Sequence, residues 1–395
     1  MKFMVIFGTR PEAIKIIPVI KKLKESGYQV IICVTAQQRE MLDQSLDFFD
    51  ITPDYDLNIM VNCQDLFYVT AEILARLKKI LEKEKPDIVL VQGDTSTAFT
   101  ASLAAFYMQI PIGHIEAGLR THNKYNPFPE EKNRHLISVL TDYHFAPTEL
   151  ARNNLTKEGI PDSQIWVTGN TVIDTLLEVI SRQSSDVKQE ELGRHFKERW
   201  KLTLTDDNQK RILVTGHRRE SFGEDFRNIC MALKGIAEKN PDTTIIYPVH
   251  LNPNVQKPVN EILGSHSTNR LDDTAPKNIF LLEPLEYEYF VYLMSKSYII
   301  MTDSGGIQEE APSLHKPVLV MRSTTERSEG IEANTLRLVG TKKDVISREA
   351  QQLLDNKDVY DTMSKSINPY GDGKAAGRIV DVLIENLASG SNSKR

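Results

Sequence analysis

The chain has 395 residues, well above the ~150 residues of a typical single domain, so we expect two domains. Its 40% hydrophobic and 26% charged residues are typical of a globular protein with a sizeable core. The net charge of −6 argues against a dedicated nucleic-acid-binding protein. Three widely spaced cysteines indicate neither a disulfide framework nor a zinc site, and no segment is typical of a signal peptide or a membrane span. We therefore expect a cytoplasmic protein with no nucleic-acid or membrane partner.

Short apolar runs alternate with helical patterns along the whole chain. Helical patterns such as 12–25, 66–84, 225–238 and 286–296 separate most of the apolar runs. Continuous apolar strands between helices predict parallel sheets that are covered on both faces, and so an α/β fold. The predicted strands are 2–7, 29–34, 87–92, 110–115, 143–146 and 164–168 in the first half, and 211–215, 243–249, 278–282, 297–302, 317–321 and 335–339 in the second.

The two halves share a layout. Each opens with a strand, a glycine, a polar residue, an arginine and then a helix that begins with an acidic residue, at 5–12 and at 213–220. A polar helical connector at 181–210 separates them. This layout predicts two Rossmann-like domains that face each other across a cleft. Ligands of such sheets bind beyond the carboxyl ends of the strands, so the chemistry is expected there.

The loop after the first predicted strand reads GTRPE, at 8–12. It lacks the Gly-x-Gly-x-x-Gly fingerprint, which counts against a nicotinamide enzyme. Gly8 permits a tight turn, Pro11 suits the start of a helix, and Arg10 is placed to reach an anion. A simple helix start with a solvated Arg10 is the alternative.

A second loop, within 302–310, follows an apolar strand and precedes a helix. Ser304, Gly305 and Gly306 would leave backbone N–H groups open to a phosphate. Glu310 lies four residues after Gly306 and shares its helix face, where it could accept both hydroxyls of a ribose. The alternative is an ordinary capped helix whose acidic residues are favoured by the helix dipole.

Three acidic residues follow strands or turns in the first half, namely Asp94, Glu116 and Glu130. Asp94 and Glu116 end the third and fourth predicted strands, which can be neighbours in a doubly wound sheet. Carboxylates gathered at one place shift one another's pKa and can divide acid and base roles. Taken singly, each also fits an N-cap, a loop acid or a first-turn acid.

Two histidines follow strands in the second half. His217 lies beside Arg218 and Arg219, and His250 ends the next strand. A histidine near phosphates can neutralise the charge of a leaving group or move a proton. No histidine pair or carboxylate set has metal-ligand spacing, so we expect no metal and no cofactor. A Gly-x-Ser-x-Gly elbow is also missing, which leaves serine hydrolysis unsupported.

Taken together, these motifs resemble the non-hydrolysing UDP-N-acetylglucosamine 2-epimerases of bacteria. The resemblance rests on the start GTRPEAIK, on GHRRE at 216–220, on YPVHLNP at 247–253 and on 302–313, and it covers essentially the whole chain. It implies a glycosyltransferase-B-like fold and a homodimer. The implied parts are an N-terminal domain at 1–170, a UDP-binding domain at 171–367, a helix at 368–388 that packs back on the first domain, and a polar tail at 389–395.

The resemblance also implies an activity, the interconversion of UDP-GlcNAc and UDP-ManNAc for surface polysaccharides. In that family UDP is eliminated to leave 2-acetamidoglucal and then adds back. Which carboxylate removes the proton and which delivers it stays open. The implied roles are acid–base chemistry for Asp94, Glu116 and Glu130, action near the diphosphate for His217, a further active-site cation for Lys15, diphosphate contacts for Arg10, Ser304, Gly305 and Gly306, a ribose contact for Glu310, a uracil contact for Phe290 and a substrate contact for His250.

The chain departs from the family pattern at a few positions. Gln38 and Gln92 stand where many relatives have histidine. Glu72 stands where bacterial members of the family often carry an arginine. Those members also bind UDP-GlcNAc at a second, activating site. A reversed charge there should weaken an anion contact.

Three other functions use similar residues. A hydrolysing epimerase of the same fold would release free ManNAc, and a retaining glycosyltransferase would need a sugar acceptor. A nucleotide-sugar sensor would bind UDP-GlcNAc without exchanging its C-2 hydrogen.

Overall fold

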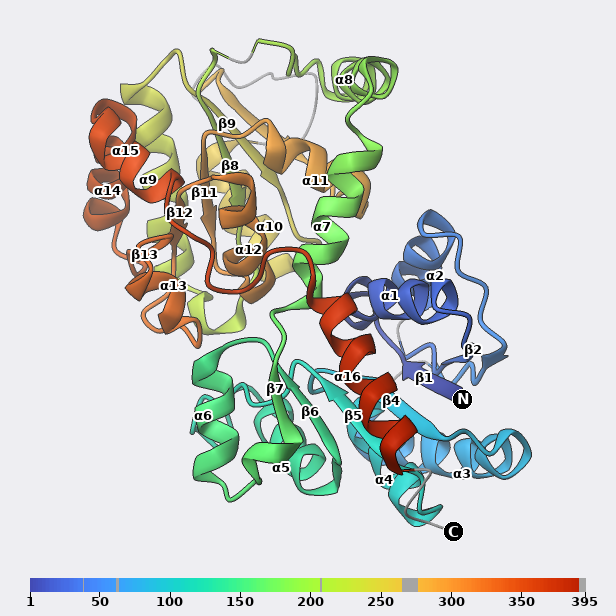
Figure 1. Ribbon diagram of the computed structural model, residues 1–395. Coiled ribbons are helices and arrows are strands. Elements are labelled where there is room, and N and C mark those ends of the chain that lie inside the picture. Colours follow the sequence, from blue (N-terminus) through green and yellow to red (C-terminus); the bar gives the residue numbers. More distant parts are fainter. Residues whose placement is uncertain (38, 62–63, 207, 265–275, 391–395) are drawn as a thin grey trace. The chain divides into compact units, whose positions relative to one another are not determined.

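The computed structural model describes residues 1–37, 39–61, 64–206, 208–264 and 276–390, and divides the chain into two compact units (Figure 1). The first unit contains Met1–Thr175 and the chain from Tyr370 onward, and the second contains Leu176–Pro369. Helix α7 (Thr171–Arg182) runs from the first unit into the second. The first boundary therefore lies inside a helix, five residues beyond the boundary expected at 170.

The N-terminal unit is a parallel sheet with helices on both faces (Figure 1). Its strands are β1 (Lys2–Phe7), β2 (Gln29–Val34), β3 (Tyr55–Asp56), β4 (Ile88–Gln92), β5 (Ile112–Ile115), β6 (Tyr143–Ala146) and β7 (Ile165–Val167). Its helices are α1 (Arg10–Glu25), α2 (Arg39–Phe48), α3 (Leu66–Glu84), α4 (Ser96–Tyr107), α5 (Glu130–Leu140), α6 (Glu149–Lys157), the 3-10 turn η1 (Asp162–Gln164) and α16 (Ala375–Gly390).

The C-terminal unit repeats this design. Its strands are β8 (Arg211–Thr215), β9 (Thr244–Pro248), β10 (Ile279–Leu282), β11 (Ile299–Thr302), β12 (Val318–Val320) and β13 (Leu336–Leu338). Its helices are α8 (Asp186–Trp200), η2 (Arg219–Ser221), α9 (Glu224–Lys239), α10 (Pro253–Leu263), α11 (Tyr287–Ser295), α12 (Gly305–Glu310), η3 (Ala311–Leu314), α13 (Ser328–Glu332), α14 (Lys343–Asp355) and α15 (Lys357–Ser364).

Both sheets have a doubly wound strand order. The first is ordered β3-β2-β1-β4-β5-β6-β7 and the second β10-β9-β8-β11-β12-β13, and all neighbouring strands in these orders are parallel. Such an order reverses between β1 and β4 and again between β8 and β11. The prediction of two Rossmann-like α/β domains is confirmed, whereas the arrangement across a cleft stays a prediction.

The central strands explain why the fold could be predicted from periodicity. Residues Phe3 to Phe7 of β1 are all fully buried, and β1 pairs with β2 in the register Val5↔Ile32. A strand that is covered by helices on both faces has no polar side, so its sequence is a continuous apolar run. Among the strands that the structure describes, β3 alone has no predicted counterpart, and it has just two residues.

The last helix belongs to the first unit. Asp174 accepts hydrogen bonds from the backbone N–H groups of Ala375 and Ala376 at 3.2 and 2.9 Å. A carboxylate at a helix N-terminus satisfies N–H groups that have no acceptor within the helix. Asp174 thereby anchors the start of α16.

Candidate functional site

The carboxyl ends of β1, β4 and β5 carry three of the predicted site residues. Arg10 opens α1 after β1, Asp94 follows β4, and Glu116 follows β5. Because β1 and β4 flank the switch point of this sheet, the edge beyond them is where a doubly wound fold binds its ligand. The topology therefore positions these residues at one edge of the sheet.

Glu116 is buried and its carboxylate is held by three side chains. It accepts hydrogen bonds from Lys15 Nζ at 2.6 and 2.7 Å, from Asn170 Nδ2 at 3.1 Å and from Gln92 Nε2. Its backbone has a φ of +68°, a left-handed conformation that costs energy for a residue other than glycine. Lys15, predicted only as a further cation, is thus the charge partner of Glu116. The sequence marks Gln92 only as a departure from the family pattern and gives no signal for Asn170.

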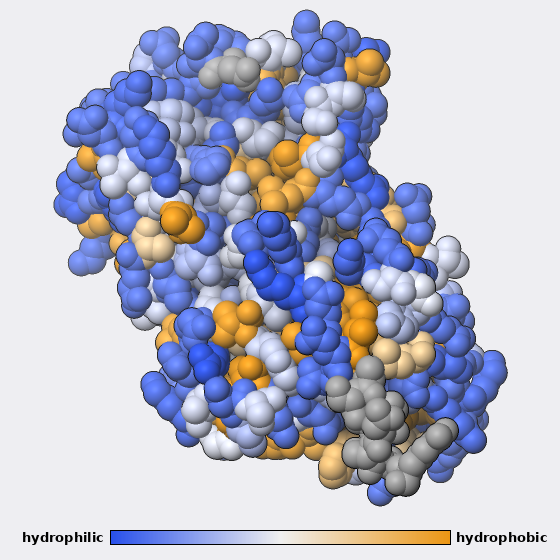
Figure 2. All heavy atoms as spheres, viewed as in Figure 1, coloured by the Kyte–Doolittle hydropathy of each residue, from blue (hydrophilic) through white to orange (hydrophobic). Residues whose placement is uncertain are grey.

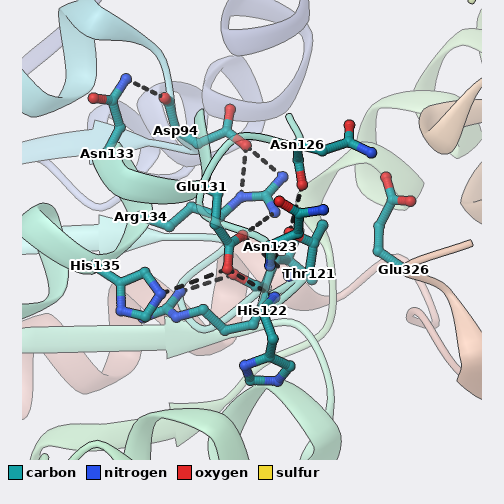
Figure 3. A network of polar contacts seen from close by, with 12 residues as sticks. Asp94, Thr121, His122, Asn123, Asn126, Glu131, Asn133, Arg134, His135 and Glu326 are labelled. Carbon is teal, nitrogen blue, oxygen red and sulfur yellow. Dashed lines mark hydrogen bonds and ion pairs between the residues drawn. The ribbon is translucent and has the colours of Figure 1, made fainter. Parts of the chain in front are cut away.

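Asp94 is held by helix α5 (Figure 3). Arg134 donates to Asp94 Oδ2 from Nε at 2.8 Å and from Nη2 at 2.7 Å, and Asn133 Nδ2 donates to the Asp94 backbone oxygen at 2.9 Å. The alternative role of Asp94 as an N-cap is wrong, because Thr95 caps α4 by accepting from the N–H of Ala98. The Asp94 side chain is instead an ion-pair partner at the strand end.

Glu131 is a site residue that the sequence did not suggest. It is 1% exposed and accepts from the backbone N–H groups of Thr121 at 3.0 Å and His122 at 2.9 Å. Arg134 Nη1 lies 3.3 Å from its Oε2. Burial acts to raise the pKa of Glu131, but these hydrogen bonds and the charge of Arg134 bring that pKa below its ordinary value. The i,i+3 spacing hinted at the pair, but only the fold shows that the same arginine reaches Asp94.

Helix α5 therefore connects two of the three predicted acids. Glu130 is its first residue and is half-buried. The next turn of the helix binds Asp94 through Asn133 and Arg134. The relative position of Asp94 and Glu130 consequently depends on the contacts of this one helix.

The GTRPE loop is fastened by its own acidic residue. Glu12 is 1% exposed and accepts from the Gly8 N–H at 3.1 Å, from Thr9 Oγ1 at 2.8 Å and from Thr95 Oγ1 at 2.7 Å. Burial raises the pKa of Glu12 to about 7, although these hydrogen bonds act to lower it. A Cβ at Gly8 would lie 2.0 Å from Thr35 Oγ1, so only glycine fits there. Glu12 ties the loop after β1 to the loop after β4, next to Arg10 and Asp94.

In the second unit, His217 follows β8 and stacks on His250. Their ring centroids are 5.2 Å apart with an interplanar angle of 14°. Asp303, which follows β11, accepts from the backbone N–H groups of His217 and Arg218 at 2.7 and 2.8 Å. The predicted acid-led helix start at Glu220 is wrong, because a 3-10 turn covers Arg219–Ser221 and α9 begins at Glu224.

The predicted phosphate cradle lies after β11, where α12 begins at Gly305. Ser304 precedes this helix, and its hydroxyl makes no capping hydrogen bond. The first N–H groups of a helix have no intrahelical acceptor and suit an anion. A Cβ at Gly305 would lie 2.9 Å from the guanidinium carbon of Arg327, which forms an ion pair with Glu309 at 2.9 Å. A side chain at position 305 would therefore have to displace the guanidinium of this buried arginine.

The residues expected at the ribose and the uracil lie on adjacent elements. Glu310 is 5% exposed, and its Oε2 accepts from the hydroxyl of Tyr287 at 2.8 Å. Phe290 is half-buried on α11, three residues after Tyr287 and on the same helix face. A Cβ at Gly306 would lie 3.4 Å from Glu310 Oε1, which places that carboxylate beside the helix start.

The structure thus groups the predicted residues within each unit, while their roles in binding and catalysis stay predictions. Glu72 forms an ion pair with Arg76, one turn further along α3, at 2.6 Å. Gln38 lies outside the described residues. In the described part of the chain, no group of three or more His, Cys, Asp or Glu residues could hold a metal ion.

The surface is mainly hydrophilic on the face shown in Figure 2, with hydrophobic side chains in separate patches. Among the described residues, no helix is both long and apolar enough to cross a membrane.

Two doubly wound sheets, each with polar side chains at its switch point, define a two-domain α/β protein of the glycosyltransferase-B-like class. A glycotransferase of kitacinnamycin shares this fold with a TM-score of 0.64 at 12% identity. The family model described as UDP-N-acetylglucosamine 2-epimerase matches residues 21–384, and the chain belongs to that family of enzymes.

Individual relatives agree with this assignment over nearly full length. The UDP-N-acetylglucosamine 2-epimerase of Campylobacter jejuni is 53% identical over 390 residues, which are 97% of each chain. The crystal structure of the Neisseria meningitidis enzyme bound to UDP-GlcNAc has a TM-score of 0.89 at 49% identity, with 98% of this chain and 100% of that chain covered. The Methanocaldococcus jannaschii enzyme, in complex with UDP-GlcNAc and UDP, has a TM-score of 0.80 at 34% identity with the same coverage.

The raised pKa of Glu12 predicts a pH-dependent stability. Its protonated form stabilises the fold fully below the ordinary value near 4.5, and this contribution is lost as the pH rises through about 7. Glu12→Gln mimics the protonated form at every pH. We expect the variant to match the wild type at pH 5 and to exceed its free energy of unfolding by about 2–3 kcal/mol at pH 8. Denaturant unfolding at both pH values measures this, and parallel pH curves would contradict it.

Arg134 should matter for turnover beyond its contribution to stability. Arg134→Lys keeps the charge but cannot bond Asp94 and Glu131 through one planar fork. We expect kcat to fall by about 10- to 100-fold, because small displacements of catalytic groups cost that much.

Arg120→Lys is the matched control. Arg120 is also buried, and it binds Glu158 at 2.7 Å and Ser138 at 2.9 Å rather than Asp94 or Glu131. Equal losses of kcat in the two variants at equal stability would remove the specific role of Arg134.

Proposed function

We propose that the protein interconverts UDP-GlcNAc and UDP-ManNAc without net hydrolysis, and that it supplies activated ManNAc for surface polysaccharides. The observation that carries this proposal is the set of acids at the first switch point, in a chain of this family. Asp94 and Glu116 end neighbouring strands, and each is paired with a cation. We also propose that the protein forms a homodimer, as the family resemblance implies.

The chemistry explains why a site of this kind is needed. The C-2 hydrogen of the sugar is not next to a carbonyl group, so it is poorly acidic. Departure of the anomeric phosphate therefore runs ahead of proton removal. The C-1–oxygen bond breaks with its electron pair going to UDP, the C-2 proton passes to a base, and a C-1=C-2 double bond forms as 2-acetamidoglucal. Re-addition reverses these steps with protonation from the opposite face.

The two parts of this reaction need different groups of the protein. The leaving diphosphate gains negative charge, which cations and helix N–H groups stabilise. We assign that role to Arg10, His217 and the backbone at Ser304, Gly305 and Gly306. Acid–base groups on two faces of the sugar complete the inversion, and we assign them to Asp94, Glu116 and Glu130.

Deuterium incorporation tests the reaction itself. Incubation with UDP-GlcNAc in deuterated water should place deuterium at C-2 of both UDP-GlcNAc and UDP-ManNAc, because the proton leaves and returns through solvent-exchangeable groups. Mass spectrometry and proton NMR of the recovered sugars measure it.

The rival functions give different products in the same experiment. A folded protein that binds UDP-GlcNAc without exchange would be a sensor. Sustained release of free ManNAc would indicate the hydrolysing reaction.

Amide substitutions test the acids one at a time. Asp94→Asn, Glu116→Gln and Glu130→Gln each keep the shape of the side chain but remove its ability to exchange a proton. We expect turnover to fall by several hundredfold, within the ~100- to 10,000-fold contribution of such groups. Comparing the rate of C-2 exchange with the rate of epimer formation shows which step each residue serves. A variant with near-normal rates would remove its residue from the set.

A further inference from the structure

A buried carboxylate lies directly behind His217. Asp303 has no solvent exposure, and its Oδ2 accepts from the backbone N–H groups of His217 at 2.7 Å and Arg218 at 2.8 Å. Its Oδ1 is buried without a hydrogen-bond partner in the described chain, and lies 3.5 Å from His217 Nδ1. A buried carboxylate oxygen without a donor is costly, so a small rotation of the imidazole that completes this bond is favourable.

We propose that Asp303 is a positioning residue that orients His217, with Nδ1–H facing the carboxylate and Nε2 facing the substrate diphosphate. This inference rests on the proposed function, in which His217 acts on the leaving group. Hydrogen bonds in unliganded active sites are often long and tighten only when substrate binds. The 3.5 Å separation fits such a bond before substrate arrives.

The other groups around His217 do not provide this orientation. His250 stacks on the plane of the ring, and its own Nδ1 accepts from the N–H of Asn252 at 3.1 Å. Arg218 carries a positive charge, which repels an imidazolium. Among the described residues, Asp303 favours the protonated form of His217, whereas His250 and Arg218 disfavour it.

The pKa of His217 depends on the same neighbouring groups. Burial lowers the pKa of His217, Asp303 raises it, and His250 and Arg218 lower it further. A protonated imidazole at the diphosphate would neutralise charge as UDP leaves. Asp303 would therefore set both the ring atom that meets the phosphate and the pH range in which it carries a proton.

Asp303→Asn tests this role while preserving size. The amide oxygen can still accept the two backbone N–H groups, but the amide NH₂ would then donate to His217 Nδ1. The neutral ring should switch to the Nε2–H tautomer, as it does when the aspartate of a serine protease triad is replaced by asparagine. We expect kcat to fall by at least ~100-fold. The limb on which kcat decreases with rising pH should move to lower pH, because the variant loses the group that raises the pKa of His217.

Tyr247→Phe is the matched control. The Tyr247 hydroxyl donates to the backbone oxygen of Gly216 at 2.9 Å, so this variant also removes a buried hydrogen bond from the same loop. It changes no charge and does not touch the imidazole. We expect it to keep the pH profile and the tautomer of the wild type.

Nitrogen-15 NMR of histidine-labelled protein reads the tautomer directly, with His217→Gln used to assign the signal. The wild type should carry Nδ1–H when His217 is neutral, and this measurement needs no variant that might fail to fold. An Nε2–H tautomer in the wild type would overturn the proposal. So would an Asp303→Asn variant with an unchanged tautomer and pH profile. Missing C-2 deuterium in the wild type contradicts the proposed function instead, whereas a wrong tautomer with normal exchange contradicts only the role of Asp303.

Discussion

A carboxylate that leaves bulk water must be stabilised by fixed donors or charges, and this constraint shapes both switch points. Ionised groups buried without partners are too costly to persist in a folded protein. Glu116 is matched by Lys15, and Asp94 and Glu131 share Arg134. The partners come from α1 and α5, the helices that follow or face the strand ends. The positions of these helices are therefore tied to the chemistry and cannot vary independently of it.

Much of the fold followed from the sequence because it depends on local periodicity. Apolar runs such as 2–7 and 87–92 are buried on both sides by helices, so the pattern that predicts a strand also predicts a parallel sheet. The two-residue strand β3 escaped prediction because a pair of residues carries no period. The placement of Asp94 and Glu116 at neighbouring strand ends also followed from the predicted topology.

The partners of those acids did not follow, because they are set by contacts between distant residues. Arg134 lies 40 residues from Asp94, and Lys15 lies 101 residues from Glu116. The i,i+3 spacing of Glu131 and Arg134 is also common on solvated helix faces, so the local pattern does not indicate that Arg134 reaches Asp94. Glu131 illustrates the same limit, since its backbone partners at Thr121 and His122 are neighbours only after the intervening loop has folded. The charge partners can therefore be identified only from the tertiary structure, whereas the strand ends can be predicted from the sequence.

Both units use a buried carboxylate to connect two loops, but the carboxylate comes from a different loop in each unit. In each, one buried carboxylate fastens the loop after the first strand to the loop across the switch point. In the first unit Glu12 comes from the first loop and reaches Thr95 after β4, whereas in the second Asp303 comes from the loop after β11 and reaches back to His217.

The sequences GTRPE and GHRRE look alike, but their last residues, Glu12 and Glu220, therefore have different structural roles. Glu220 forms an ion pair with Arg322 at 2.6 Å. The carboxylate that connects the two loops of the second unit is Asp303. Glu12 is held mainly by hydroxyl groups, and burial raises its pKa to about 7 although these hydrogen bonds act to lower it. Asp303 instead receives two backbone N–H groups, which suit an ionised carboxylate. The contacts of Glu12 in the first unit therefore suit a neutral acid. The contacts of Asp303 in the second unit suit a negative charge beside a histidine.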